Sequence, residues 1–346
     1  MVRGRTPLGV VLGLALAAAA TLTLAGRAAS APRLAPVPAD RLVASALAAL
    51  AADRPLTGQV AATVDLGLPK LVSSRLGAAA GPLDAISGEH RLRIWSSPEG
   101  RRLAELLPAA ERAVVVGRGG VWAWDSTTFT AWRLADGPPP PAPAAAAEAA
   151  SLADPLALAH RALAAVRPTT AVSVAAGVRV AGRPAYLLRL APRQAGTLVG
   201  RVEVAVDAAS RLPLRVAVWP RGAAHPALAA AFTSLRLGPV DSAVFEFRPP
   251  PGAAVRRPPA APAGARAAPR YLPRVVGAGW TAVVALPLPR EAAAAMQAGP
   301  VGRAGLLPFS GPLLSAWLAR RGDDAWLLYG AVPQAALLAA ERRLPS

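Results

Sequence analysis

Period-two alternation of apolar and polar residues recurs through short segments of this chain, and it constrains the fold more than any other feature. Such alternation is typical of strands with one buried face. It runs through residues 56–66, 86–95 and 112–116. Residues 120–132 continue it after the glycine-rich run 117–120, whose composition is that of a hairpin turn. We therefore expect successive strands joined by hairpins.

A second block of strands follows, with few helices between. We expect strands at residues 178–180, 185–190, 198–206, 213–219, 232–237 and 245–247, and helices at 40–53 and 154–166. Sequence-adjacent hairpins with few helices favour an antiparallel sheet that curls on itself. The predicted class is mainly β (α+β): an incomplete, curved antiparallel barrel with covering helices and a small α+β domain behind it.

The domain boundaries follow from composition. Residues 256–270 are almost entirely Pro, Ala, Gly and Arg, which is typical of a semi-extended linker. The tail predicts strands at 280–286 and around 317–329, and helices at 289–297 and 333–342. We expect an N-terminal leader at 1–31, a barrel domain at 32–255, a linker at 256–272 and a small domain at 273–346.

The N-terminus predicts export. Arg3 and Arg5 precede the uncharged apolar run 8–25, the pattern of a signal peptide, which is also long enough to remain as a membrane anchor. The chain carries a formal charge of +18. A basic exported protein usually faces anionic polymers or an anionic membrane surface. Nucleic acid is not expected as a partner, because the arginines are scattered rather than clustered.

Motifs for chemistry are absent from the sequence. There is no cysteine, no phosphate-binding glycine loop and no His-Glu-x-x-His, and the three histidines lack metal-ligand spacing. Glu203 and Asp207 do not form a convincing acid–base pair. We therefore expect a protein that is not an enzyme and that holds no cofactor and no metal.

Apolar residues on the predicted strands are the remaining candidates for a site. An apolar concavity lined by tryptophans and aliphatic residues suits an acyl chain, although ordinary core packing explains the same residues. Alternation places them in pairs on common faces but does not tell which face lines the cavity. The candidate ligand-binding residues are Leu92, Ile94, Trp95, Val114, Val116, Trp122, Trp124, Leu188, Leu190, Val202, Val204, Leu214 and Val216.

In their order and amino-acid sequence, these segments resemble the LolA/RseB-like superfamily of periplasmic lipoprotein-carrier-like proteins. The segments that carry the resemblance include RGGVWAWDSTTFTAWRL (118–134), VAGRPAYLL with VEVAVD and LPLRV (180–216), and FEFRPPPGAAV (245–255). The tail segments VVGAGWTAVVAL (275–286) and DDAWLLYGAVPQAALLAA (323–340) are similar to the C-terminal domain of RseB-like (MucB-like) members.

The resemblance implies a half-barrel whose apolar concavity accepts acyl chains of lipids or lipoproteins. It also implies an alternative, an RseB-like regulator that binds a membrane anti-sigma factor in envelope stress signalling. The chain departs from the lipoprotein members in having no cysteine for lipidation, and from a soluble carrier in having a second domain. In both cases we expect an exported protein on the outer face of the membrane. Its partner is a lipid or lipoprotein in the first case and a membrane protein in the second.

Overall fold

The computed structural model describes the two folded parts of the chain. The described residues are 32–67, 88–136, 155–156, 159, 169–257, 273–288, 293–294, 297–298, 308–321 and 324–344. The predicted leader 1–31 and most of the predicted linker lie outside them, as do His160, nearly all of the helix expected at 154–166 and most of that at 289–297. Within the described residues, every helix is too short or too polar to cross a bilayer.

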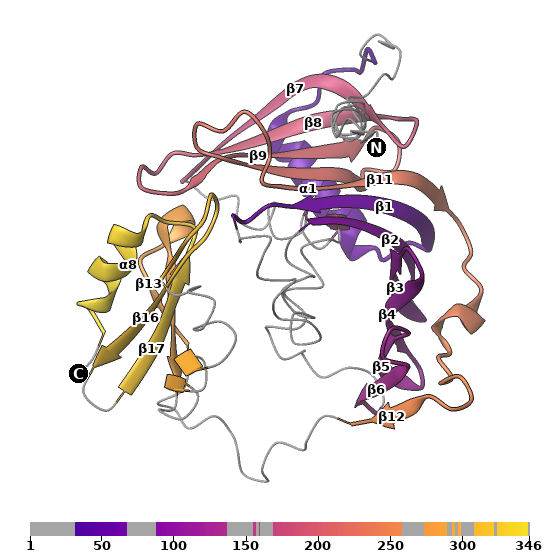
Figure 1. The fold of residues 1–346 in the computed structure, drawn as a ribbon. Helices are drawn as coiled ribbons and strands as arrows, with labels where there is room; N and C mark the ends of the chain where they lie inside the picture. Colours follow the sequence, from indigo (N-terminus) through magenta and orange to yellow (C-terminus); the bar gives the residue numbers. More distant parts are fainter. Residues whose placement is uncertain are drawn as a thin grey trace, which may run out of the picture.

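A single large sheet forms the first part (Figure 1). Its order is β12-β6-β5-β4-β3-β2-β1-β11-β10-β9-β8-β7. The strands are β1 (Leu56–Val64), β2 (Gly88–Ser97), β3 (Gly100–Leu107), β4 (Ala110–Gly117), β5 (Gly120–Asp125), β6 (Thr130–Ala135), β7 (Thr170–Val180), β8 (Arg183–Pro192), β9 (Val199–Asp207), β10 (Pro213–Pro220), β11 (Leu228–Leu237) and β12 (Ala254–Arg256).

The sheet consists of two meanders joined along one long-range pair, β1 with β11. Val64 of β1 lies opposite Leu228 of β11, and Leu56 lies opposite Leu237. Every neighbouring pair is antiparallel except β12 with β6, which is parallel. The sheet bends strongly between its two halves, and its end strands β12 and β7 do not pair with each other (Figure 1). The expectation of a mainly β protein with an incomplete, curved antiparallel barrel is confirmed.

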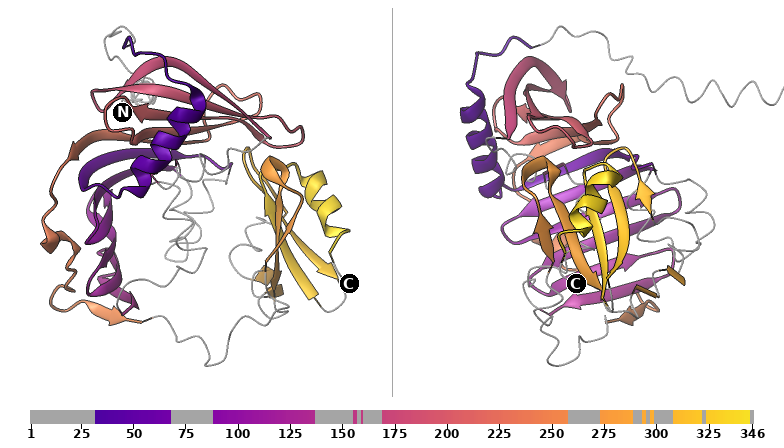
Figure 2. Two further views of the ribbon diagram at one scale, coloured as in Figure 1. Left: turned by 180° about the vertical axis from the view of Figure 1, so that it is seen from behind. Right: turned by 90° about the vertical axis from the view of Figure 1, so that its left-hand side faces the viewer.

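Helix α1 (Ala39–Ala51) covers one face of this sheet (Figure 2, left). It buries Leu42, Val43, Ala46 and Ala49, which lie along one stripe of the helix, in the main hydrophobic core. Pro55 follows its C-terminal end and leads into β1. We call the sheet face that contacts α1 the inner face and the opposite one the outer face.

A second, separate sheet is formed by the strands that come after β12 in the chain. Its order is β13-β14-β17-β16-β15, from β13 (Arg274–Val276), β14 (Val283–Leu288), β15 (Phe309–Ser310), β16 (Ser315–Arg321) and β17 (Asp324–Gly330). Helix α8 (Gln334–Glu341) packs on it through Leu337 and Ala340, and forms a separate core with Trp326 and Leu328. The small α+β unit expected from the tail is present, as Figure 1 shows.

Directed polar contacts join the second sheet to the end of the first. The side chain of Gln194 donates to the Ala278 carbonyl at 3.1 Å and accepts from the Trp280 amide at 2.8 Å. The Trp280 indole N–H donates to the Thr170 hydroxyl at 2.8 Å. Thr197 donates to the Ala331 carbonyl at 2.9 Å, so that the two sheets meet through several hydrogen bonds rather than through the linker alone.

Several sequence expectations differ from the structure. Strand β3 was not expected, because its residues GRRLAELL do not alternate. The single strand expected at 120–132 is a hairpin, since Ser126–Phe129 form a turn between β5 and β6. Residues 245–247 were expected as a strand, but Ser242–Phe245 form a short 3₁₀ helix whose start is capped by the Asp241 carboxylate.

Candidate ligand-binding face

Most of the predicted site residues lie on the inner face, within the core that α1 covers. Cross-strand pairing brings them together: Leu188 lies opposite Val204, and Val204 lies opposite Val216. Leu188, Leu190, Val204 and Leu214 are fully buried. The members of this cluster from the predicted set are Leu92, Ile94, Leu188, Leu190, Val202, Val204, Leu214 and Val216. The space beneath α1 is therefore filled by protein side chains.

The inner face continues beyond α1 onto β3–β6. Here the pairing aligns Ile94, Leu103, Val114, Ala123 and Trp132 across five consecutive strands, and we call this set the apolar row. Ile94 is fully buried, whereas the other four are only partly buried. Val116 lies two residues along β4 on the same face and is also partly buried. The predicted residues Val114 and Val116 thus lie on the more accessible half of this face.

A second row, charged rather than apolar, runs beside the apolar row on the same face. Glu105, Arg112 and Asp125 are aligned across β3, β4 and β5, and we call them the charged row. Arg112 Nε lies 3.2 Å from Asp125 Oδ2. Leu92 is the β2 residue opposite Glu105, and His90, two residues away on the same face, contacts the row diagonally, with His90 Nδ1 2.6 Å from Glu105 Oε1. Nothing in the spacing of these residues along the sequence brings them together; only the strand register does.

The charged row includes a carboxylate with a shifted pKa. Burial by itself would raise the pKa of Asp125, but hydrogen bonds from Thr127 and the positive charge of Arg112 outweigh this effect. The pKa of Asp125 consequently lies below its ordinary value, and the carboxylate stays ionised at neutral pH. His90 is buried, and its Nε2 atom has no hydrogen-bond partner.

The predicted tryptophans lie on the outer face, away from the inner-face cluster. Pairing places Trp95 in line with Arg102, Val115 and Trp122. Trp122 and Trp124 pack against Phe247, with ring centroids 5.5 and 6.0 Å apart. Phe247 belongs to residues 238–253, which run along the side of β3–β6 that faces away from the second sheet (Figure 1).

This outer packing depends on two glycines. A Cβ on Gly117 would lie 2.2 Å from the Phe245 carbonyl oxygen, and one on Gly100 would lie 2.7 Å from the Phe245 ring. The absence of side chains there lets the 242–247 segment contact the sheet backbone directly. Trp122 and Trp124 therefore contribute to packing between the sheet and this segment.

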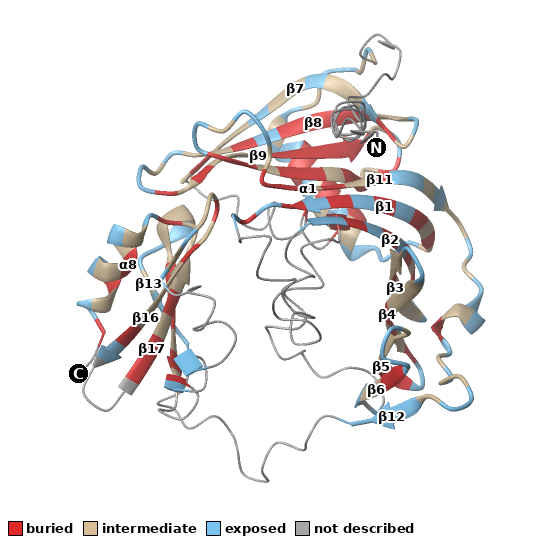
Figure 3. Ribbon diagram, viewed as in Figure 1, coloured by how far each residue is buried: buried red, intermediate tan, exposed pale blue. Residues whose placement is uncertain are grey.

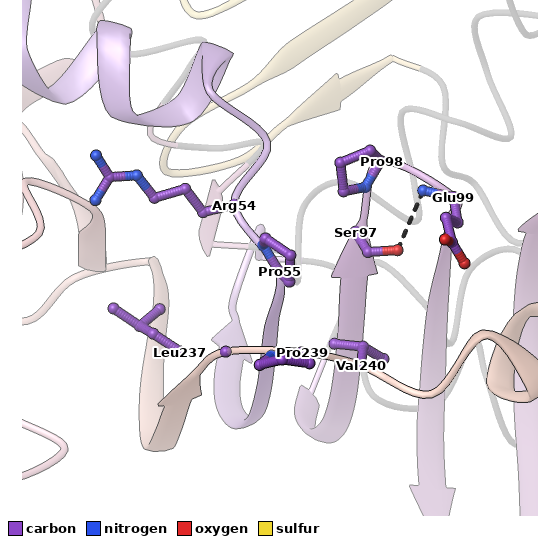
Figure 4. A pocket seen from close by; sticks show the side chains of 9 residues that line it. Arg54, Pro55, Ser97, Pro98, Glu99, Leu237, Pro239 and Val240 are labelled. Carbon is purple, nitrogen blue, oxygen red and sulfur yellow. Dashed lines mark hydrogen bonds between the residues drawn. The ribbon is translucent and has the colours of Figure 1, made fainter.

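An open groove of about 560 Å³ lies at the ends of β1, β2 and β11 (Figure 4). Its walls carry Pro55, Pro98 and Pro239, and the Ser97 hydroxyl accepts a hydrogen bond from the Glu99 amide at 3.2 Å. The charged side chains Arg54 and Glu99 lie on opposite sides of the groove in Figure 4. They do not converge on one point where a ligand would contact both.

Acidic residues singled out in the sequence have structural partners. Glu203 pairs with Arg189 and Arg201, and Asp207 pairs with Arg183. In the part of the chain that the structure describes, no group of three or more His, Asp or Glu side chains is arranged to hold a metal ion. On the inner face, an apolar row is thus bordered by charged side chains.

Comparison with known proteins gives matches among solved structures alone. No family model and no curated protein matches the chain. The structure of MucB in complex with the periplasmic part of MucA aligns at 16% identity and a TM-score of 0.45, over 87% of this chain and 96% of that one. A MucA/MucB complex of Pseudomonas aeruginosa aligns at 17% identity and the same TM-score, over 88% of this chain and 96% of that one.

A LolA-superfamily protein of Nitrosomonas europaea aligns with a shorter part. The identity is 11% and the TM-score 0.25, and the alignment covers 61% of this chain and 99% of that one.

Proposed function

We propose that this protein is a non-catalytic binding protein of the cell envelope that holds acyl chains of lipids or lipoproteins on its inner face. The observation that carries the proposal is the apolar row beside the charged row on β3–β6. An amphiphile has the same two parts, a long apolar chain and a polar head. The two rows are adjacent and parallel, so that one molecule contacts both.

The apolar row has the length and chemistry that an acyl chain requires. It crosses β2 to β6, four interstrand spacings or about 19 Å. Its members Leu103, Val114 and Trp132 are partly exposed, so a chain lying on them removes apolar surface of both partners from water. Each methylene buried in this way contributes about 0.8 kcal/mol.

The charged row supplies the polar end of the site. Arg112 is next to Val114 on the inner face of β4, so its guanidinium lies beside the apolar row, where a carboxylate or ester oxygen of the ligand would lie. The filled core beneath α1 leaves β3–β6 as the part of the inner face on which a chain binds without displacing this helix.

The proposal is extended to the whole chain in two respects. The apolar run 8–25 directs export, and residues 273–346 form a second folding unit behind the linker. The alternative function is that of an RseB-like regulator with a protein partner, an anti-sigma factor in the membrane. The hydrogen bonds of Gln194 and Thr197 favour this alternative, because they hold the second sheet against the first. Acyl binding on β3–β6 does not require a second sheet held in this position.

Native mass spectrometry and fluorescent fatty-acid titration test the proposal. The purified protein is expected to carry acyl species and to bind the probe. The replacement Val114→Gln removes one aliphatic contact from the apolar row, and we expect roughly tenfold weaker binding, since burying a Val side chain contributes about 1.5 kcal/mol.

The matched control is the same replacement at an exposed valine of the second sheet, Val275→Gln, which is expected to bind as the wild type does because Val275 is 64% exposed and lies on β13. Absence of bound acyl species together with no probe binding at micromolar concentration would reject the acyl proposal. In that case, capture of a membrane anti-sigma factor by the same protein would support the regulator instead.

A further inference from the structure

The outer face of β1 and β11 has a surface patch of small side chains, which we call the floor. Ala61 and Thr63 of β1 are exposed, and Ala61 lies opposite the partly buried Ala231 of β11. In Figure 3 the exposed positions appear as pale blue stretches on β1 and β11. Helix α1 covers the opposite face, whereas Gln59, Ala61 and Thr63 on this face are exposed to solvent.

Arginines stand along both sides of this floor. Arg91 of β2 pairs with Ala61, and Arg215 of β10 pairs with Ala231, so that one register row reads Arg, Ala, Ala, Arg across four strands. Residues directly opposite one another share a face. Both guanidinium groups are therefore on the outer face, separated by three interstrand spacings, or about 14 Å.

Two more arginines lie further along the same face. Arg93 is opposite Gln59, and Arg236 is opposite Thr57. They line a groove of about 400 Å³, together with Trp95 and Ser234. We call Arg91, Arg93, Arg215 and Arg236 the arginine frame.

Among the residues that the structure describes, the arginine frame has no carboxylate partner. None of its members forms an ion pair with a described residue; Arg215 stacks on the Trp219 ring at 6.0 Å. The acidic residues on this face lie outside the frame. Glu89 is opposite Thr63 at the end of β1, and Glu203 is engaged by Arg189 and Arg201. Within the described part of the chain, the arginines of the frame are therefore not paired with carboxylates.

We propose that the arginine frame is a docking surface for the phosphodiester groups of an anionic phospholipid membrane. Guanidinium groups form two-point hydrogen bonds with phosphate oxygens. One small anion cannot reach arginines that are spread over about 14 Å, whereas a lipid surface presents many phosphates at once. Trp95 in the groove adds an aromatic side chain of the kind enriched at membrane interfaces.

This surface is on the opposite side of the sheet from the proposed acyl site. The two proposals are therefore independent. A protein docked through the arginine frame keeps the apolar row of the inner face free, so loss of one kind of binding leaves the other intact.

Vesicle flotation tests the docking surface. The full chain is mixed with vesicles of phosphatidylcholine alone or with added phosphatidylglycerol, and the bound fraction is measured. The double replacement Arg93→Gln, Arg236→Gln is expected to weaken binding to the anionic vesicles about 30-fold, because each basic residue near an anionic membrane contributes about 1 kcal/mol. Raising the salt from about 0.1 M to about 0.5 M is expected to release the wild type.

The matched control is Arg33→Gln, Arg41→Gln. These exposed arginines precede and begin α1, on the other side of the sheet, and the double replacement changes the net charge by the same amount. Unchanged vesicle binding by the control supports the proposal. Equal weakening by both double variants would overturn it, since it would indicate attraction by net charge alone.

Two further outcomes are decisive. If the Arg93→Gln, Arg236→Gln variant loses binding to poly-glutamate but floats with anionic vesicles as the wild type does, the frame recognises an acidic polypeptide and the membrane proposal is wrong. If water-soluble glycerophosphoglycerol at low concentration displaces the wild type from vesicles, the frame binds a single head group in its groove and not a surface, which also contradicts the proposal.

Discussion

Arg183 holds Asp207 through a two-point ion pair, with Arg183 Nε 2.9 Å from Oδ1 and Arg183 Nη2 2.8 Å from Oδ2. The Asp207 side chain is only 1% exposed. Its Oδ2 atom also accepts hydrogen bonds from the Ser210 amide at 2.8 Å and the Ser210 hydroxyl at 2.6 Å. One carboxylate thereby ties the start of β8 to the turn between β9 and β10.

We expect Asp207→Asn to lower the free energy of unfolding by about 3 kcal/mol. The replacement leaves the partly exposed Arg183 without its carboxylate partner and removes the charged acceptor that Ser210 contacts, which together are destabilising. Urea denaturation measures the change. The control is Asp136→Asn, because Asp136 is 57% exposed and its ion pairs with Arg133 and Arg257 are at the surface. That replacement is expected to cost less than about 1 kcal/mol of unfolding free energy. Equal losses of stability in the two variants would contradict the stabilising role of the Arg183–Asp207 pair.

The same pair predicts how stability depends on pH. Burial alone would raise the pKa of Asp207, but hydrogen bonds from Arg183 and Ser210 hold it below its ordinary value. A carboxyl with a lower pKa in the folded state stabilises the fold fully above its unfolded pKa of about 3.9 and loses that contribution as the pH falls through the folded value. The stability difference between wild type and Asp207→Asn is therefore expected to be constant near neutral pH and to shrink below about pH 4. A difference that persists in acid would argue against this origin.

The outer aromatic cluster is predicted to be structural. Trp124 contacts the rings of Phe129 and Phe247 at 5.5 and 6.0 Å. We expect Trp124→Ala to cost about 3 kcal/mol of unfolding free energy, through lost burial and lost ring contacts. Phe129 is 44% exposed, so Phe129→Ala is expected to cost clearly less. Thermal unfolding compares the two, and a Trp124→Ala protein as stable as the wild type would show that the cluster contributes nothing.

The junction between the two sheets is predicted to open when Gln194 is removed. Its side-chain oxygen accepts the Trp280 amide hydrogen at 2.8 Å. In Gln194→Ala we expect the Trp280 amide to exchange with solvent about tenfold faster, since a hydrogen bond contributes about 1 kcal/mol or slightly more. The amide of Leu328, in the centre of the second sheet, serves as the internal control and is expected to exchange at its original rate. Equal acceleration at both amides would indicate unfolding of the whole sheet.

Limited proteolysis tests the predicted linker at 256–272. Residues 256–270 of this linker are Pro, Ala, Gly and Arg, and a segment without large apolar side chains is exposed and easily cut. Trypsin at low concentration is expected to release a barrel fragment that ends near Val255, detected by mass spectrometry. Resistance of this segment while other exposed loops are cut would contradict two separately folding units.

The proposed acyl-binding face could be predicted only in part. Leu188 with Leu190 and Val202 with Val204 share a face because side chains alternate along any strand, and this much follows from residue order alone. Which of the two faces α1 covers depends on how the sheet bends in space. Trp122 and Trp124 show the difference: alternation pairs them correctly, whereas their position beneath Phe247 depends on a segment more than a hundred residues away in the chain.

The groove that Arg93 and Arg236 line was not predictable at all. These arginines are far apart in sequence and come together because β1 pairs with both β2 and β11. The charged row on the inner face has the same origin: Glu105, Arg112 and Asp125 are unremarkable in the sequence and are aligned by the register of three strands. A search for His or Glu at fixed spacing does not find such rows.

The amino-acid sequence by itself determined the local periodicity, and with it the fold class, most strands, the helices α1 and α8 and the expectation of a chain without catalytic motifs. It did not reveal β3, whose residues do not alternate, or the turn at 126–129 that divides one apparent strand into β5 and β6. The tertiary structure decided the pairing of β1 with β11, the face that α1 covers and the rows of side chains that cross the strands. The physical reason is that alternation acts within a strand over a few residues, whereas register and curvature arise from backbone hydrogen bonds and packing between segments far apart in the chain.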